Sequence, residues 1–410
     1  MKKFFALLLS LAMVLALVAC GQKDPTPDTP DTPDDPQTKV EYKVAMITDY
    51  GDITDQSFNQ TTYEACKAFA EDNSIEFSYF KPAGDNTADR VAMIEKAVDE
   101  GFNVIVMPGY AFGGAIVEAA PEFPDVKFIA LDVAAGDLLE TAVAKAGESY
   151  DFNPSNWDLN KYVDMSNVYC AVYQEELCGY MAGYAAVKLG YKNLGFLGGM
   201  SVPAVVRYGY GFVQGVDAAA ADLGLTDVKL NYIYGGQFFG DADITAVMDT
   251  WYQGGTEVVF ACGGGIYTSA VDAAKKVGAK VIGVDVDQAG VIANYAGVDG
   301  MTVTSAMKGL YPATYDTLTD VIVNGNWEKY VGKIETLGLV SGTDPEANYV
   351  QIPMGDGTQW SDSFTQDDYK AMVKDMFDGK ITVSNNTSSD VSAADFATVI
   401  TVDDQGSIKG

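Results

Sequence analysis

A short segment near the start of the chain gathers side chains that could bind or transform a small molecule. It reads DYGDITDQSFNQ over residues 49–60. Carboxylates, hydroxyls and amides hydrogen-bond polar ligands, and an aromatic ring among them offers an apolar face. The segment is typical of a strand end, a turn and a helix start, where Asp55 or Ser57 can cap the helix by accepting backbone N–H bonds. Phe58, in the first helical turn, either projects its ring into a cleft or packs in the core.

Similar glycine- and aspartate-rich segments follow other predicted strands. They read PGYAFGG over residues 108–114, CGGG over 262–265 and VDVDQAG over 284–290. Ligands of open α/β sheets bind beyond the carboxyl ends of the strands. The sequence therefore predicts a ligand site that several strand ends build together.

The elements that must position these segments alternate along the chain. Continuous apolar runs are typical of strands covered on both faces, and their alternation with amphipathic segments predicts βαβ units on parallel sheets. The number of strands exceeds that of one small doubly wound domain, so we expect two similar α/β lobes with a cleft between them. The expected strands are 44–48, 75–80, 103–107, 127–132, 168–172, 194–197, 229–233, 258–261, 281–284 and 301–306, and the expected helices are 57–71, 88–100, 115–122, 175–189, 204–223, 242–253 and 270–277.

Length and composition exclude several function classes. The 410 residues are enough for two lobes, since ordinary domains have roughly 100–200 residues. Acidic residues outnumber basic ones 57 to 26, and a surface this negative repels the phosphates of nucleic acids. The chain contains no histidine, which removes Ser–His–Asp catalysis, Cys–His catalysis and His-ligated zinc.

The N-terminus has the pattern of a secretory signal. Lys2 and Lys3 precede an apolar run over residues 4–18, which is shorter than the roughly 20 residues that span a membrane. The run ends in LVAC, which resembles a bacterial lipobox with Cys20 as the diacylated first residue of the mature protein. Residues 21–38 are rich in Pro, Asp and Thr and predict an extended tether. Acyl chains on Cys20 would anchor the protein without spanning the membrane.

The other cysteines are Cys66, Cys170, Cys178 and Cys262. None forms a CxxC pair, so zinc and thioredoxin-type motifs are absent. We expect buried free thiols, and a Cys170–Cys178 disulfide is the alternative.

The segment over residues 49–60 resembles the opening motif of the basic-membrane-protein family of lipoproteins, which are substrate-binding components of ABC transporters and include purine-nucleoside receptors. Further segments resemble family motifs in the same order, up to about residue 384. They are PEFPDVKFIALD (121–132), QEELCGYMAG (174–183), LGG (197–199), GFVQG (211–215), GVDVDQ (283–288), TSAMK (304–308) and GKITV (379–383).

The resemblance implies a two-lobed periplasmic-binding-protein type I-like fold with a ligand cleft between the lobes. It also implies a lipid-anchored protein on the extracytoplasmic face of the cell membrane, with ABC permease and ATPase subunits as partners, no cofactor and no enzymatic activity. The tether resembles those of Gram-positive lipoproteins. The expected domains are a signal at 1–19, a lipidated tether at 20–40, lobe 1 at 41–174 plus 302–325, lobe 2 at 175–301 plus 326–384, and a C-terminal extension at 385–410.

The resemblance also implies roles for matching residues around a purine nucleoside. Phe58 would stack on one face of the base and Phe239 on the other, with Phe238 as the alternative. Carboxylates would accept hydrogen bonds from the ligand, including those of the ribose hydroxyls, and glycines would let the backbone approach the sugar. The full set of expected site residues is Asp49, Phe58, Asn59, Asp132, Phe238, Phe239, Gly263, Gly264, Asp285 and Lys308.

The sequence departs from the family where Gly113 and Gly114 replace a common acidic residue, and there Tyr110 and Phe112 would add aromatic surface. A sugar, a flavin or a signalling molecule is therefore an alternative ligand, and a nucleoside hydrolase-like activity of the aspartates is a different class of function. The same segments leave four more interpretations open. They are an S-x-x-K acyl enzyme at residues 305–308, calcium on the aspartates of 49–55 or 285–287, phosphate at 263–265, and the aromatics of 232–239 as ordinary core.

Overall fold

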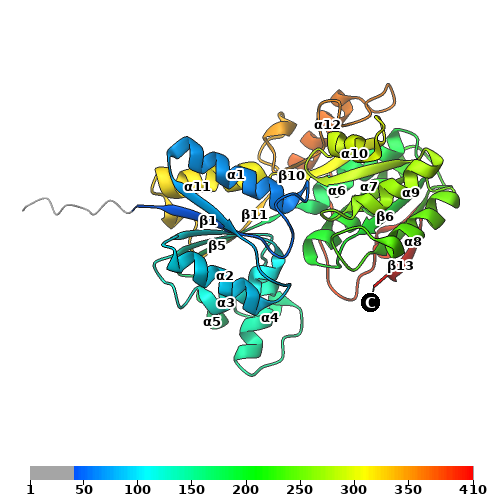
Figure 1. The fold of residues 1–410 in the computed structure, drawn as a ribbon. Coiled ribbons are helices and arrows are strands. Elements are labelled where there is room, and N and C mark those ends of the chain that lie inside the picture. Colours follow the sequence, from blue (N-terminus) through cyan, green and yellow to red (C-terminus); the bar gives the residue numbers. More distant parts are fainter. Residues whose placement is uncertain (1–40, 410) are drawn as a thin grey trace, which may run out of the picture. The chain divides into compact units, whose positions relative to one another are not determined.

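The computed structural model describes residues 41–409. The predicted signal, the Cys20 lipidation site and the tether lie outside these residues. From residue 42 onward the described chain forms one compact unit, and its strands make two separate sheets (Figure 1). Each sheet with the helices packed on it is called a lobe below.

Lobe 1 is built on a six-stranded sheet in the order β11-β5-β4-β3-β1-β2, in which all neighbouring strands are parallel. Its strands are β1 (Lys43–Ile47), β2 (Glu76–Phe80), β3 (Val104–Pro108), β4 (Lys127–Leu131), β5 (Val168–Tyr173) and β11 (Ile334–Leu337). Helices α1 and α11 pack together on one face, and α2, α3 and α4 pack on the other (Figure 1). The helices are α1 (Phe58–Asn73), α2 (Thr87–Asp99), α3 (Gly113–Ala119), α4 (Ala135–Lys145), α5 (Leu159–Tyr162) and α11 (Leu310–Leu318).

Lobe 2 is built on a seven-stranded sheet in the order β12-β10-β9-β8-β6-β7-β13, parallel except for β12. Its strands are β6 (Asn193–Gly198), β7 (Lys229–Tyr234), β8 (Val258–Cys262), β9 (Lys280–Asp285), β10 (Thr302–Lys308), β12 (Val350–Gln351) and β13 (Thr401–Ser407). Its helices are α6 (Glu175–Lys188), α7 (Pro203–Asp222), α8 (Ala242–Gln253), α9 (Tyr267–Val277), α10 (Ala289–Ala296) and α12 (Gln366–Phe377). Every residue of the central strands β3 and β8 is buried, as expected when helices cover both faces.

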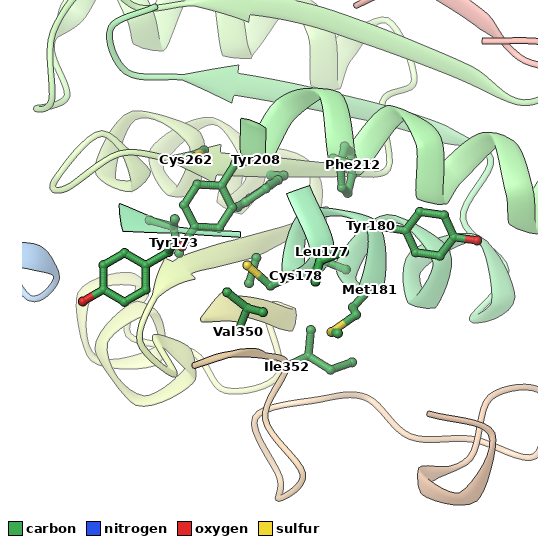
Figure 2. Close-up of a cluster of buried hydrophobic side chains, with 14 of the residues drawn as sticks. Tyr173, Leu177, Cys178, Tyr180, Met181, Tyr208, Phe212, Cys262, Val350 and Ile352 are labelled. Carbon is green, nitrogen blue, oxygen red and sulfur yellow. The ribbon is translucent and has the colours of Figure 1, made fainter. Parts of the chain in front are cut away.

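The hydrophobic core continues from lobe 1 into lobe 2. Figure 2 shows side chains from the end of β5, from α6 and α7, and from β8 and β12 in one cluster. Helices α6 and α7 approach closely because glycines on each helix face the backbone of the other. A Cβ on Gly179 would lie 2.3 Å from the carbonyl oxygen of Tyr208, and one on Gly211 would lie 2.1 Å from that of Glu176.

The division of the chain between the lobes differs from the one expected from the sequence. Strand β10 lies in the second sheet between β9 and β12, so residues 302–308 belong to lobe 2. Helix α11 packs on α1, and β11 pairs with β5, so residues 310–337 belong to lobe 1. The expected extension at 385–410 contains β13, which pairs with β7. The reason is that similar apolar strands fit either sheet, and the tertiary pairing selects one.

Two further outcomes concern residues 41–409 as a whole. The four cysteines in this range are buried and free, so there is no Cys170–Cys178 disulfide. No helix in the same range combines the length and the apolar character that a membrane crossing requires.

Candidate ligand-binding site

A cavity of about 420 Å³ lies where the carboxyl ends of strands from both sheets face each other. Its volume falls in the range of small-molecule sites, roughly 300–1,000 Å³. The segments after β1, β2, β3 and β4 supply the lobe 1 side. The lobe 2 side comes from the segments after β6, β7 and β8 and from the last residues of β9 and β10. All ten residues expected from the sequence line this one cavity: Asp49, Phe58, Asn59, Asp132, Phe238, Phe239, Gly263, Gly264, Asp285 and Lys308.

Asp49 is held in place by donors of its own loop. Its Oδ1 accepts the N–H of Tyr50 at 2.6 Å and that of Gly51 at 2.7 Å, together with Nδ2 of Asn59 at 3.2 Å. Burial raises the pKa of Asp49 above its usual value, although these hydrogen bonds act against the rise. Oδ1 of Asn59 is buried and has no hydrogen-bond partner among the described residues. This amide oxygen can therefore accept a bond from a ligand donor.

Asp55 and Ser57, the two possible caps of α1, have different hydrogen-bond partners. Asp55 accepts the backbone N–H groups of Ser57 and Asn59 at 2.9 Å and that of Gln60 at 3.1 Å, so it is the cap. The Ser57 hydroxyl instead donates to Oδ2 of Asp285 at 2.5 Å. This bond joins lobe 1 to lobe 2 beside the cavity.

The candidate aromatic residues differ in how much of each side chain is exposed and in what their rings pack against. Phe58 is half-buried, and the Lys308 ammonium lies 4.6 Å from its ring centroid. Phe238 packs its ring so close to Gly263 that a Cβ there would lie 2.7 Å from it. Phe239 is 55% exposed, so it is the freer of the two neighbouring rings. In contrast, Tyr232 is fully buried and stacks on Phe196, so the aromatics of 232–239 divide into core and cavity.

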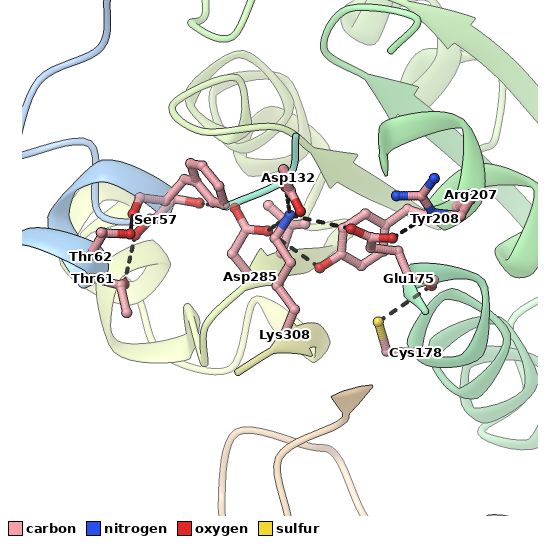
Figure 3. Close-up of polar contacts among 12 residues, drawn as sticks. Ser57, Thr61, Thr62, Asp132, Glu175, Cys178, Arg207, Tyr208, Asp285 and Lys308 are labelled. Atoms are coloured by element: carbon pink, nitrogen blue, oxygen red, sulfur yellow. Dashed lines mark hydrogen bonds and ion pairs between the residues drawn. The ribbon is translucent and has the colours of Figure 1, made fainter. Parts of the chain in front are cut away.

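A buried ionic network closes the polar end of the cavity (Figure 3). Lys308 pairs with Asp132, and its Nζ lies 3.6 Å from Oδ1 of Asp285 and 3.6 Å from Oε1 of Glu175. Burial alone would lower the pKa of Lys308, but the three carboxylates outweigh it and raise the pKa above its usual value. The lysine is therefore a fixed cation at this end of the site. Oδ1 of Asp132 is buried without a partner among the described residues, which leaves an acceptor for a ligand.

The ends of β4 and β9 turn sharply into the site. Asp132 and Asp285, one residue beyond β4 and the last of β9, have φ angles of 59° and 65°. Residues other than glycine rarely adopt these positive φ angles, and those that do cluster at ligand sites.

Three residues of the network were not expected from the sequence. Glu175, which is fully buried, accepts a 2.7 Å bond from Nε of Arg207, and the Tyr208 hydroxyl donates to Oδ1 of Asp285 at 3.3 Å. The available signal was an acidic pair, Glu175 and Glu176, at the start of an otherwise apolar helix.

One expectation near the glycines needs correction, whereas Tyr110 lines the cavity. Phe112 is fully buried in the core and adds no surface to the cavity. Gly113 and Gly114 lie where α3 packs on α4, since a Cβ on Gly113 would lie 2.4 Å from the carbonyl oxygen of Asp137. The conformation of Gly263, with φ at 146°, serves the packing of Phe238.

The competing chemistries find little support in the geometry. Ser305 does not line the cavity, and its Oγ accepts the N–H of Gln288 at 3.1 Å. Asp52 lies exposed and pairs with Lys81. Within residues 41–409, no three or more acidic or cysteine side chains gather as metal ligands would.

Comparisons with known proteins agree with this arrangement. A family model described as "ABC transporter substrate-binding protein PnrA-like" matches residues 42–343. The ABC transporter nucleoside-binding protein BmpA of Lactococcus lactis subsp. cremoris is 25% identical over 392 residues, which cover 92% of this chain and 96% of the relative. An uncharacterized lipoprotein of Pyrococcus abyssi is 26% identical, over 74% of this chain and 69% of its own.

Solved structures show the same fold. The crystal structure of ABC transporter system solute-binding proteins from Aeropyrum pernix K1 superposes with a TM-score of 0.59 at 19% identity, over 83% of this chain and 87% of that one. The periplasmic-binding-protein type I-like fold expected from the sequence is confirmed.

Proposed function

The chain belongs to the family of PnrA-like ABC transporter substrate-binding proteins, and on that premise we propose that it binds a purine nucleoside in the cavity between its two lobes. Proteins of this family bind solutes for ABC importers and are not enzymes, and permease and ATPase subunits complete the transporter. The identity of the ligand, a purine nucleoside, is what we propose for this chain. The observation that carries it is one cavity lined by both aromatic rings and buried carboxylates.

The base would lie between aromatic rings. The Lys308 ammonium lies over one face of the Phe58 ring, and the base would stack on the opposite face. Phe239, exposed at the cavity, would cover the opposite face of the base, with Phe238 as the alternative. Stacking of this kind contributes on the order of 1–3 kcal/mol per base.

The sugar would lie toward the carboxylates. Asp285 already contacts Ser57 and Tyr208, but a carboxylate has about four acceptor positions and can also take ribose hydroxyls. Oδ1 of Asp132 and Oδ1 of Asn59 are further acceptors without partners among the described residues. A site built to pair hydroxyls rejects analogues that lack them.

We also propose that Cys20 carries the lipid that holds the protein at the outer face of the membrane. The sequence around Cys20 resembles a lipobox, and the relative from Pyrococcus abyssi bears the name lipoprotein. Replacing Cys20 with Ala should release the protein from the membrane fraction, and a variant that stays membrane-bound would contradict lipidation at this residue.

Calorimetric titration tests the ligand. We expect inosine, guanosine or adenosine to bind with micromolar or tighter affinity, because the cavity supplies both stacking faces and hydroxyl acceptors. Ribose and riboflavin are titrated in parallel, and tight binding of either in place of the nucleosides would replace the proposed ligand. Mass analysis of the recovered nucleoside should show it unchanged, and a released base would establish hydrolysis instead.

A further inference from the structure

The last residues of the chain reach the loop that carries the candidate stacking rings. Strand β13 extends the second sheet at its β7 edge (Figure 1). The N–H of Ile408 then donates to the carbonyl oxygen of Tyr234, the last residue of β7, at 2.8 Å. The last described residues therefore lie where residues 236–241, called the aromatic loop below, begin. This segment lies beyond residues 42–343, which match the family model.

Lys409 contacts the aromatic loop on both sides of its two phenylalanines. Its ammonium forms an ion pair with Asp241 and a 2.9 Å hydrogen bond with Oε1 of Gln237. Its backbone is also close, because a Cβ on Gly236 would lie 2.7 Å from the carbonyl oxygen of Lys409. One residue thus fixes the beginning and the end of a short loop.

The same two partners organise the interior of the loop. The Gln237 amide donates to the carbonyl oxygen of Phe239 at 2.9 Å and to Oδ2 of Asp241 at 3.0 Å. Asp241 also caps α8, because its Oδ1 accepts the N–H of Ile244 at 3.0 Å. Phe239 is 55% exposed, so packing holds its ring only weakly. The loop backbone is held by these polar contacts together with the bridge between Phe239 and Gly265.

Residues 398–405, which precede Lys409, are hydrogen-bonded to α7 and α8. Asp217 of α7 accepts four hydrogen bonds, from the hydroxyl and N–H of Thr398 at 2.6 and 2.8 Å and from the N–H groups of Val399 and Ile400 at 2.8 and 3.2 Å. Further along, Oε1 of Gln405 accepts the indole N–H of Trp251. The end of the chain is thus anchored to α7 and α8 before it reaches the loop.

We propose that residues 398–409 are a positioning segment for the aromatic loop, and that Lys409 holds Phe239 in the geometry that covers the ligand's base. The proposal rests on the proposed function for the identity of the ligand. The part that concerns the loop alone stands on the contacts of Lys409 and can be tested without ligand.

The experiment compares Lys409→Ala with Lys380→Ala. Lys380 makes exposed ion pairs with Asp375 and Asp378 on α12, so the control removes the same charge away from the site. In the ligand-free protein, we expect amide exchange over residues 236–241 to be several-fold faster in Lys409→Ala and unchanged in Lys380→Ala. Lys409→Arg, which keeps the charge and the donors, should restore protection.

A double-mutant cycle with Phe239→Ala separates positioning from general stability. We expect Lys409→Ala to weaken inosine binding by about 3- to 10-fold, as for coupled neighbours. In the Phe239→Ala background it should cause no further loss, because the ring on which it acts is gone. An equal loss in both backgrounds, or unchanged loop exchange, would overturn the proposal. If the wild type binds no nucleoside, the proposed function fails, and loop exchange alone decides whether Lys409 positions the loop.

Discussion

Lys308 is the residue at which the two lobes and the cavity meet. Its ammonium lies among the carboxylates of Asp132, Asp285 and Glu175 and over the ring of Phe58. Asp132 and Phe58 belong to lobe 1, whereas Lys308 and the other two carboxylates belong to lobe 2. A single charge therefore supports both the contact between the lobes and the polar end of the site.

Replacing Lys308 with Met should destabilise the protein by about 3–5 kcal/mol, because Asp132 and Asp285 lose their buried counter-charge and Glu175 keeps only Arg207. The free energy of unfolding by urea at neutral pH measures this loss. The loss should shrink as the pH falls, since burial raises the pKa of Glu175 and protonation relieves the repulsion. Lys380→Met, which breaks only exposed pairs, should leave the free energy of unfolding almost unchanged. Equal stabilities of the two variants would show that Lys308 is not essential to the network.

Phe58→Ala should weaken inosine binding by about 1–3 kcal/mol if the ring stacks on the base. Calorimetric titration gives the dissociation constant, and the far-UV spectrum checks that the variant is folded. Phe152→Ala is the matched control, because that ring is 72% exposed and does not line the cavity. An unchanged affinity in folded Phe58→Ala would exclude the stacking role.

At the scale of elements, the start of α6 connects the packed helices α6 and α7 to the site. Glu175 and Glu176 begin this helix directly after the chain leaves β5 for lobe 2. Both side chains are buried, and a helix N-terminus favours negative charge there. Glu175 has Arg207 and Lys308 as partners, whereas Oε2 of Glu176 has no hydrogen-bond partner among the described residues.

Glu176 should make stability fall with rising pH. Burial, aided by the neighbouring charge of Glu175, raises the pKa of Glu176 from 4.5 to about 7. The folded state therefore binds a proton that the unfolded state loses, so stability is highest below 4.5 and declines as the pH rises to about 7. The full difference is about 3 kcal/mol. Glu176→Gln should remove this part of the slope in urea unfolding measured across that range, and an unaltered slope would contradict the raised pKa.

At the scale of the whole molecule, contacts between the lobes lie beside the cavity. Ser57 bonds Asp285, Lys308 pairs with Asp132, and the Gln288 amide donates to the carbonyl oxygen of Gln56 at 3.2 Å. A ligand bound among these groups adds contacts to both lobes at once. We therefore expect ligand binding to favour the arrangement in which the two lobes are closed on the cavity.

Saturating inosine should raise the thermal midpoint of unfolding if it is a ligand, because a ligand of the folded state alone stabilises that state. At a free concentration of 100 times the dissociation constant, the stabilisation is about 2.7 kcal/mol. Differential scanning calorimetry of the protein with inosine, with ribose and without ligand gives the shift. Phe58→Ala at the same inosine concentration should show a smaller shift, and no shift for wild type would argue against nucleoside binding.

Much of the site could be located before the fold was known. Asp49, Phe58 and Asp285 follow strands that the apolar runs reveal, and the carboxyl ends of parallel strands face the same side of a sheet. The strand ends predicted a shared site, the resemblance to the family supplied the set of ten residues, and all ten line one cavity. Sequence reasoning did not find Glu175 and Arg207 as site residues, because their role comes from burial between α6, α7 and β10. It also placed Phe112 at the cavity, although that ring lies in the core.

The sequence by itself determined the alternation of strands and helices, the two-lobed α/β class and the strand ends that carry polar and aromatic side chains. These features are local, because periodicity and turn residues act within a few positions along the chain. The tertiary structure decided that β10 joins the second sheet and β11 the first, which of Asp55 and Ser57 caps α1, and where the last residues lie. These outcomes depend on which surfaces meet across the fold. The sequence around a strand or a carboxylate does not show which distant residue it will contact.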